Sequence, residues 1–329
     1  MLQTNPTEDA LTGPRFKEIS PLTWEHPADA VALKALRSLP GLDVLISRTI
    51  GRLNEANMKH RMTRGRKPAT RKSHPRLFRL YEDILATFDI TEEWPLYVVP
   101  MGGVNAGAVG MESPFLILSE EAALLADADI RVIIAHEVGH VLSGHVLYRT
   151  MMRLLLNVSW MALSGAVGFP LVIATLMAMV EWERKSELSA DRASALAMGG
   201  SAEVRSVLER LNTGHDPILM SQIEKLKLNL SDETRQKITG ALEALEKLIT
   251  KHPPIEDRIA AVEEWTASAE FAAIMAGDYP RSGAENPWGN TGFYRLKHGA
   301  KKLSSVGINL STKAGNGLIW LRRRAGLDT

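Results

Sequence analysis

The stretch from His136 to His145 constrains the fold of this chain more than any other. It lies within an apolar run of helical period that begins near Asp129. Residues four apart lie one turn above each other on the same face of an α-helix, so His136 and His140 can both reach one metal ion. Glu137 then lies beside the metal, where its carboxylate can take a proton from a water molecule. The spacing predicts a helical metal site with a general base.

A charged segment further along the chain can complete this site. Glu187 and Asp191 are four residues apart, and two interpretations are open. Either they belong to a solvated helix face, or Glu187 is the third metal ligand and Asp191 accepts the free N–H of a ligand imidazole. His145 follows His140 by five residues, about 140° around a continuing helix. We therefore expect His145 to be an outer or surface group and not a ligand.

Four segments resemble, in the same order, the zinc metallopeptidases that include the bacterial HtpX heat-shock protease and the CAAX prenyl proteases. Their sequences are V-N-A-G-A-V-G at 104–110, H-E-V-G-H-V-L-S-G-H at 136–145, E-L-S-A-D-R-A at 187–193 and T-K-H-P-P-I-E-D-R-I at 250–259. Together they are far more specific than the two histidines and the glutamate alone. The chain departs from the HtpX proteins in one respect, because it has no clear transmembrane spans.

The resemblance implies a role for each matching residue. It implies one zinc ion per chain, with the ligands His136, His140 and Glu187. It implies that Glu137 is the general base. It places two further groups near the substrate, where either could stabilise the oxyanion: His252 and Arg258. It also implies that an extended substrate pairs with the strand that contains Asn105, Ala106 and Ala108, although an ordinary interior strand remains the alternative.

The pattern of apolar residues predicts an α+β fold that is mainly helical. Three short apolar runs, at 95–100, 104–109 and 115–119, are separated by glycine-containing turns. Such runs are typical of strands. We therefore expect a small three-stranded sheet next to the helix that carries His136 and His140.

We expect three parts along the chain. Residues 1–74 form an N-terminal helical arm, and its first 20 residues are polar and form a loose extension that lacks the apolar core of a signal peptide. Residues 75–278 form the zinc metallopeptidase domain. Residues 279–329 form a basic C-terminal tail.

An uncharged run at residues 154–180 lies between the two motifs of the metal site. It is long enough for one membrane-spanning helix, which needs about 20 residues. One span would place His136 and Glu187 on opposite sides of the bilayer, so it is excluded. The run therefore predicts a helical hairpin that turns near Gly165 to Pro170. Burial in the core and contact with a membrane or partner are equally open.

Charge and composition bear on partners and location. Nine Lys or Arg residues and no acidic residue lie between Lys59 and Arg79, which favours either a solvated loop or attraction to anionic lipid headgroups. The segment has a single aromatic residue, Phe78, so we expect no nucleic-acid partner. The absence of cysteine fits a reducing compartment. These features predict a cytoplasmic protein, with peripheral membrane association through 154–180 and the basic segments as an open possibility.

The sequence thus predicts a zinc-dependent endopeptidase with protein or peptide substrates, in protein quality control at the membrane surface. Two alternatives remain open. One is a latent or non-catalytic chaperone or scaffold that keeps the metal site, and the other is a different metal-dependent hydrolase. A pure scaffold would need no general base, which favours the peptidase.

Overall fold

The computed structural model describes residues 13–39, 55–110, 113–157, 169–210 and 255–282, with a few more between 224 and 247. Its helices are α1 (Pro27–Arg37), α3 (Glu55–Met62), α4 (Pro75–Thr87), α5 (Asp127–Leu142), α6 (His145–Asn157), α8 (Phe169–Met198), α9 (Ala202–Arg210), α12 (Ile255–Thr266) and α13 (Ala269–Met275). Two short 3-10 turns, η2 (Pro21–Thr23) and η3 (Ala122–Leu124), and three strands, β1 (Leu96–Val99), β2 (Ala106–Val109) and β3 (Phe115–Ser119), complete the described elements.

The predicted α+β fold with one small sheet is confirmed. The strands lie in the order β1-β3-β2, with β1 parallel and β2 antiparallel to the central strand β3. Alternate side chains point to opposite faces of a sheet. One face, which includes Leu96 and Leu116, joins the main core, and the other, which includes Tyr97 and Ile117, packs in a second cluster with Leu154 of α6. Burial of both faces explains why the strands are continuous apolar runs.

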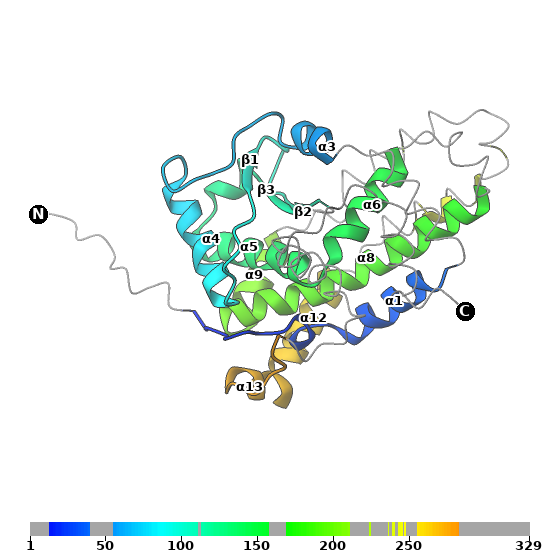
Figure 1. Cartoon of the computed structure of the whole chain (residues 1–329). Helices are drawn as coiled ribbons and strands as arrows, with labels where there is room; N and C mark the ends of the chain where they lie inside the picture. Colours follow the sequence, from blue (N-terminus) through cyan, green and yellow to red (C-terminus); the bar gives the residue numbers. More distant parts are fainter. Residues whose placement is uncertain are drawn as a thin grey trace, which may run out of the picture.

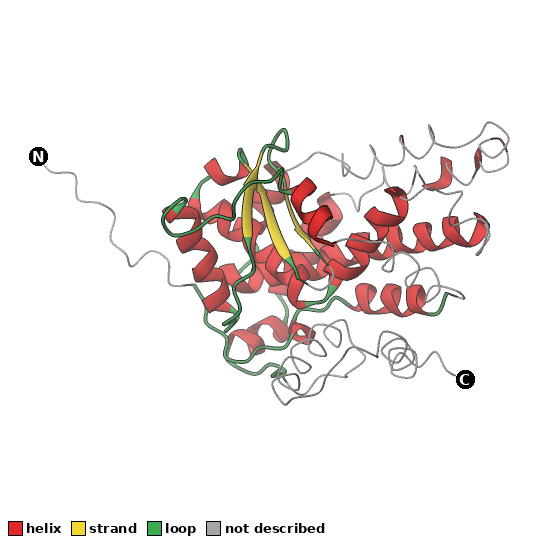
Figure 2. Cartoon of the chain, turned by 45° about the horizontal axis from the view of Figure 1, so that its top comes forward, coloured by secondary structure: helices red, strands yellow, loops and turns green. Residues whose placement is uncertain are grey.

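Two helices, α5 and α8, form the centre of the molecule. Figure 1 shows the long helix α8 running past α5, with α1 alongside it, and Figure 2 shows the sheet among the surrounding helices. Helix α5 is buried on nearly all sides, as expected for a helix with apolar residues around its circumference. Gly139 permits the close approach of α8, since a Cβ atom built there would lie 2.7 Å from the Cβ of Ala193.

The N-terminal residues that the structure describes are part of the same core. The expected loose extension is wrong for residues 13–20, because Phe16 and Ile19 are buried in the main cluster. Trp24 is fully buried and donates from its Nε1 to Ser143 Oγ, at 3.0 Å, next to the end of α5. Apolar side chains thus attach this segment to the helix that carries the predicted ligands.

The predicted hairpin at 154–180 lies partly outside the described residues. Its flanks are helical, since α6 reaches Asn157 and α8 begins at Phe169, and these helices pack against each other. Residues 158–168, which include most of the predicted turn, are not described, nor is the tail at 283–329. Within the described residues, no helix is both long enough and apolar enough to cross a membrane.

Candidate metal centre

Helix α5 places the two predicted histidine ligands side by side. His136 and His140 are one turn apart, and their Nε2 atoms lie 3.2 Å from each other. His140 is fully buried, whereas His136 keeps a small exposed surface. The two nitrogen atoms therefore face one point at the edge of the core.

Helix α8 brings a carboxylate to the same point. Glu187 Oε2 lies 3.2 Å from His136 Nε2, and Glu187 Oε1 lies 3.3 Å from His140 Nε2. Among the described residues these three form the one group of this kind that could hold a metal ion. Ligand atoms around a tetrahedral metal with bonds of about 2.0–2.2 Å lie roughly 3.3–3.6 Å apart. The observed separations fit a metal ion of that kind.

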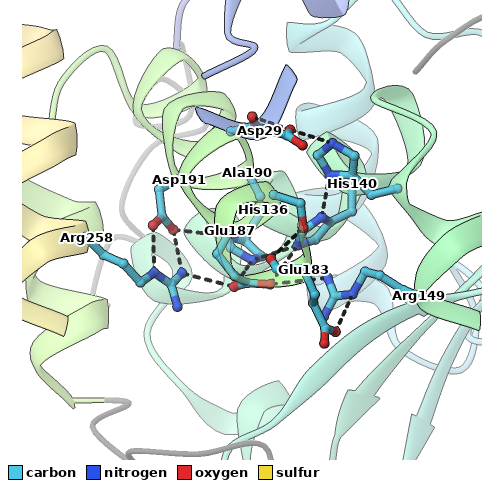
Figure 3. A network of polar contacts seen from close by, with 12 residues as sticks. Asp29, His136, His140, Arg149, Glu183, Glu187, Ala190, Asp191 and Arg258 are labelled. Carbon is cyan, nitrogen blue, oxygen red and sulfur yellow. Dashed lines mark hydrogen bonds and ion pairs between the residues drawn. The ribbon is translucent and has the colours of Figure 1, made fainter. Parts of the chain in front are cut away.

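An aspartate and an arginine fix His136 from behind. Asp191 Oδ1 lies 3.2 Å from His136 Nδ1, which leaves Nε2 of that ring for a metal. Arg258 of α12 donates to both oxygen atoms of Asp191, at 2.7 and 2.6 Å, and its Nη2 lies 3.3 Å from Glu187 Oε2. Burial would raise the pKa of Asp191, but Arg258 and His136 hold it below its usual value. Figure 3 shows Arg258 and Asp191 on one side of Glu187.

His140 has a different partner, His145, which is an outer group behind the ligand, one of the two positions expected for it. Helix α5 ends at Leu142, and a turn at Ser143 and Gly144, with φ 72° at Gly144, separates it from α6. His145 therefore begins α6, and its Nδ1 lies 2.9 Å from His140 Nδ1. The expectation of a continuing helix missed this contact. The dipeptide Ser143-Gly144 was the available signal, because glycine commonly ends a helix in the left-handed conformation.

Glu187 lies among several cations. Arg149 of α6, which no sequence pattern indicated, has its Nη1 3.4 Å from Glu187 Oε1 and its Nε 3.2 Å from Glu183 Oε1. Burial would raise the pKa of Glu187, but Arg258, His136 and Arg149 hold it well below its usual range. Burial lowers the pKa of His136, but Glu187 and Asp191 overcome this effect and raise it to about 9. The carboxylates thus hold positive charge at the point where a metal cation would bind.

Glu137 lies on α5 beside the ligands. It is buried, and its Oε2 atom has no hydrogen-bond partner among the described residues. An unpaired carboxylate oxygen in such a position is costly unless a further group uses it. A water molecule held between Glu137 and a metal ion would satisfy this atom.

The remaining predicted site residues have different outcomes. Ala106 and Ala108 lie on β2, at an edge of the described sheet, and this strand packs against α5. Asn105 lies just before β2, and its N–H donates to Ser119 Oγ at 3.0 Å. His252 lies outside the described residues, so its role stays a prediction.

Comparison with known protein families identifies the family of this chain. The model of peptidase family M48 matches residues 71–266. The chain belongs to peptidase family M48. The resemblance to HtpX-like metallopeptidases is therefore confirmed, and so is the expected class of enzyme, a metallopeptidase that hydrolyses peptide bonds.

Several M48 relatives have been named. The chain is 23% identical to the plastoglobule-localized metallopeptidase 48 of Arabidopsis thaliana, over 79% of this chain and 77% of that protein. It is 26% identical to the protease HtpX homologues of Thiobacillus denitrificans and Leptothrix cholodnii, over 50% and 52% of this chain. These matches span 63% and 66% of the two homologues, so the chain covers just under two thirds of their length. No solved structure is significantly similar to this M48 protein.

Proposed function

We propose that this M48 protein is a zinc-dependent endopeptidase. The observation that carries the proposal is the convergence of His136, His140 and Glu187 on one point, with the unpaired carboxylate oxygen of Glu137 beside them. Two imidazoles and one carboxylate are a ligand set that zinc takes in peptidases, with a further position left for water or substrate. A scaffold that only held a metal would have no use for Glu137.

The residues of the chain divide the chemistry among them. When bound, zinc lowers the pKa of a water molecule to about 7 and polarises a carbonyl oxygen. Glu137 takes the proton of the attacking water and passes it to the leaving amine. Arg258 is occupied by Asp191 and Glu187, and these contacts support a positioning role for it. Stabilisation of the oxyanion by His252 stays a prediction.

The substrate we propose is an extended segment of a protein or peptide. A strand at the edge of a sheet can pair with such a segment through its backbone N–H and C=O groups. Strand β2 has this position and packs against the metal helix α5, which supports the role proposed for residues 105–108. Recognition through the backbone makes few demands on side chains, as suits the removal of damaged proteins.

We further propose that the protein works in the cytoplasm at an anionic membrane surface. The exposed cations of the basic segment 59–79 support the membrane surface, and the absence of cysteine fits a reducing compartment such as the cytoplasm.

The decisive experiment separates zinc binding from catalysis. We expect wild-type protein to bind one zinc per chain and to cleave unfolded casein. Glu137→Gln should keep zinc and lose about 100- to 10,000-fold in rate, since a general base contributes that much. Glu187→Ala should lose zinc, measured by mass spectrometry of the metal content.

The matched control is Glu203→Gln, which makes the same change on the exposed face of α9 and should alter neither readout. Zinc binding without cleavage by the wild type would favour the latent or scaffold alternative. A wild type without zinc would contradict the proposal.

A further inference from the structure

The contact between His140 and His145 extends to the N-terminal segment. His145 Nε2 lies 2.9 Å from Asp29 Oδ2 of α1, and both side chains are 0% exposed. The His145 ring also forms a T-shaped contact with Trp182, with ring centroids 5.6 Å apart. A buried line of contacts thus runs from Asp29 through His145 to His140, and Figure 3 shows Asp29 at the top of the network and Arg258 at its left.

Asp29 is itself held from two further directions. Trp182 Nε1 donates to Oδ1 at 2.9 Å, and Ser189 Oγ donates to Oδ2 at 2.7 Å. Burial would raise the pKa of Asp29, but His145 and these two donors hold it below its usual value. The carboxylate therefore stays ionised and presents only acceptors to its neighbours. Its side chain is directed at α6 and α8, and not at its own helix.

Only one arrangement of the ring protons of His140 and His145 is compatible with metal binding by His140 Nε2. If Nε2 of His140 binds the ion, the proton of that ring is on Nδ1 and faces His145 Nδ1. Neutral His145 must then accept at Nδ1, which places its own proton on Nε2, the atom that lies 2.9 Å from Asp29 Oδ2. An acceptor at Asp29 therefore selects the tautomer of His140 that leaves Nε2 free.

We propose that Asp29 is a positioning residue of the metal centre, acting on the ligand His140 through His145. The two imidazole ligands would then be fixed by different devices. His136 is fixed by Asp191 directly, within the region that matches the M48 model, whereas Asp29 lies outside the matched residues 71–266. The N-terminal segment thereby becomes part of the metal site. The inference rests on the metal site of the proposed function, and not on peptidase activity.

The test measures zinc affinity by competition with a chromophoric chelator. Asp29→Asn keeps the shape of the side chain but turns one acceptor into a donor, toward Trp182 or toward His145. We expect its zinc affinity to fall about 10- to 100-fold, the usual effect of losing an outer partner of a metal ligand. Leu33→Ala, which loosens α1 at a buried apolar position, is the matched control and should change the affinity less than threefold.

A double-mutant cycle separates positioning from general destabilisation. His145→Asn retains an acceptor near the position of Nδ1 but cannot reach Asp29. In this background Asp29→Asn should have no further effect on zinc affinity. A folded Asp29→Asn protein with wild-type affinity, or an undiminished effect in the His145→Asn background, would overturn the proposal.

One measurement on the unmutated protein stands even where a variant does not fold. Nitrogen-15 NMR of histidine-labelled, zinc-loaded protein should show His145 with its proton on Nε2 and none on Nδ1. A proton on Nδ1 of His145 would overturn the proposal. Failure of the wild type to bind zinc would instead count against the proposed function, so the two failures are distinguishable.

Discussion

The ionisation state of a partly buried side chain depends on its individual neighbours. His26, which is half-buried, illustrates this principle away from the metal. It precedes α1, and its Nδ1 accepts the N–H of Ala28 at 3.1 Å. Burial and Arg192, with a smaller effect of Lys185, lower its pKa to about 4, against the opposing charge of Asp29. Protonation would also remove the acceptor that caps the helix.

This shift predicts a pH dependence of stability. Between about pH 6.5 and pH 4 the unfolded chain takes up a proton at His26 that the folded chain does not, so stability falls as the pH is lowered. His26→Asn keeps a capping acceptor but does not titrate. Urea unfolding at pH 7.5 and pH 5 should therefore show a smaller loss of stability in the variant. Equal losses in both proteins would contradict the assignment, and comparison with the variant removes the contribution of other groups.

At the scale of elements, the contact between α5 and α8 brings the ligands from the two helices together. Ser194 Oγ donates to the carbonyl of Val132 at 3.1 Å, and Gly139 faces Ala193 across the same contact. The separation of the two helices sets the distance from His140 to Glu187. Gly139, the glycine between the two histidines, therefore allows the close packing of α5 and α8, a role that the metal motif alone does not indicate.

This contact predicts the effect of Gly139→Ala. On an unconstrained helix the change would stabilise by about 1 kcal/mol. Here the new methyl group meets Ala193, which cannot move without its helix, so we expect destabilisation by about 1–3 kcal/mol. Chemical denaturation of metal-free protein measures the effect. Gly200→Ala, with no atom within 4 Å of its Cβ, is the control.

A second substitution checks the cause. Ala193→Gly removes the opposing methyl group, so the double variant should recover much of the lost stability. If Gly139→Ala is as stable as the wild type, the two helices are not in the close contact described above.

At the scale of the whole molecule, some cations of the basic segment 59–79 have local partners, whereas a group of others is exposed and has no carboxylate partner among the described residues. Four arginines of this segment pair with the carboxylates of Glu120, Glu82 and Asp127. Lys59 lies over the rings of Tyr97 and Phe115. Four exposed cations have no carboxylate partner among the described residues: Arg61, Arg64, Lys67 and Lys72. Each contributes about 1 kcal/mol to binding near an anionic lipid surface.

These cations predict weak, salt-sensitive membrane binding. Sedimentation should show binding to vesicles that contain phosphatidylserine and little to neutral vesicles. Binding should weaken as the salt concentration rises, because the Debye length falls from about 10 Å at 0.1 M to about 3 Å at 1 M. Replacing the four residues by glutamine should abolish it, whereas Arg205→Gln, at a cation paired with Glu209 and Glu263, should not. Equal binding to neutral vesicles would show that charge is not responsible.

Interactions between residues close in sequence explain which features of this protein the sequence alone determined. The helical repeat puts His136 and His140 on one face whatever the helix packs against, and short apolar runs formed the three predicted strands. Family motifs added Glu187 and Asp191, which the structure brings to the histidines. These features follow from neighbours along the chain or from a recognisable pattern.

Tertiary structure decided what depends on contacts between distant segments. No periodicity links Asp29 to His145, or Arg149 to Glu187, because these pairs meet only when α1 and α6 pack against α8. The turn at Gly144 placed His145 against His140, and burial of Phe16 and Trp24 attached the N-terminal segment to the core. Local geometry determined that the two histidine ligands share one face of α5, whereas packing determined the approach of Glu187 and the contacts of Asp29 and Arg149.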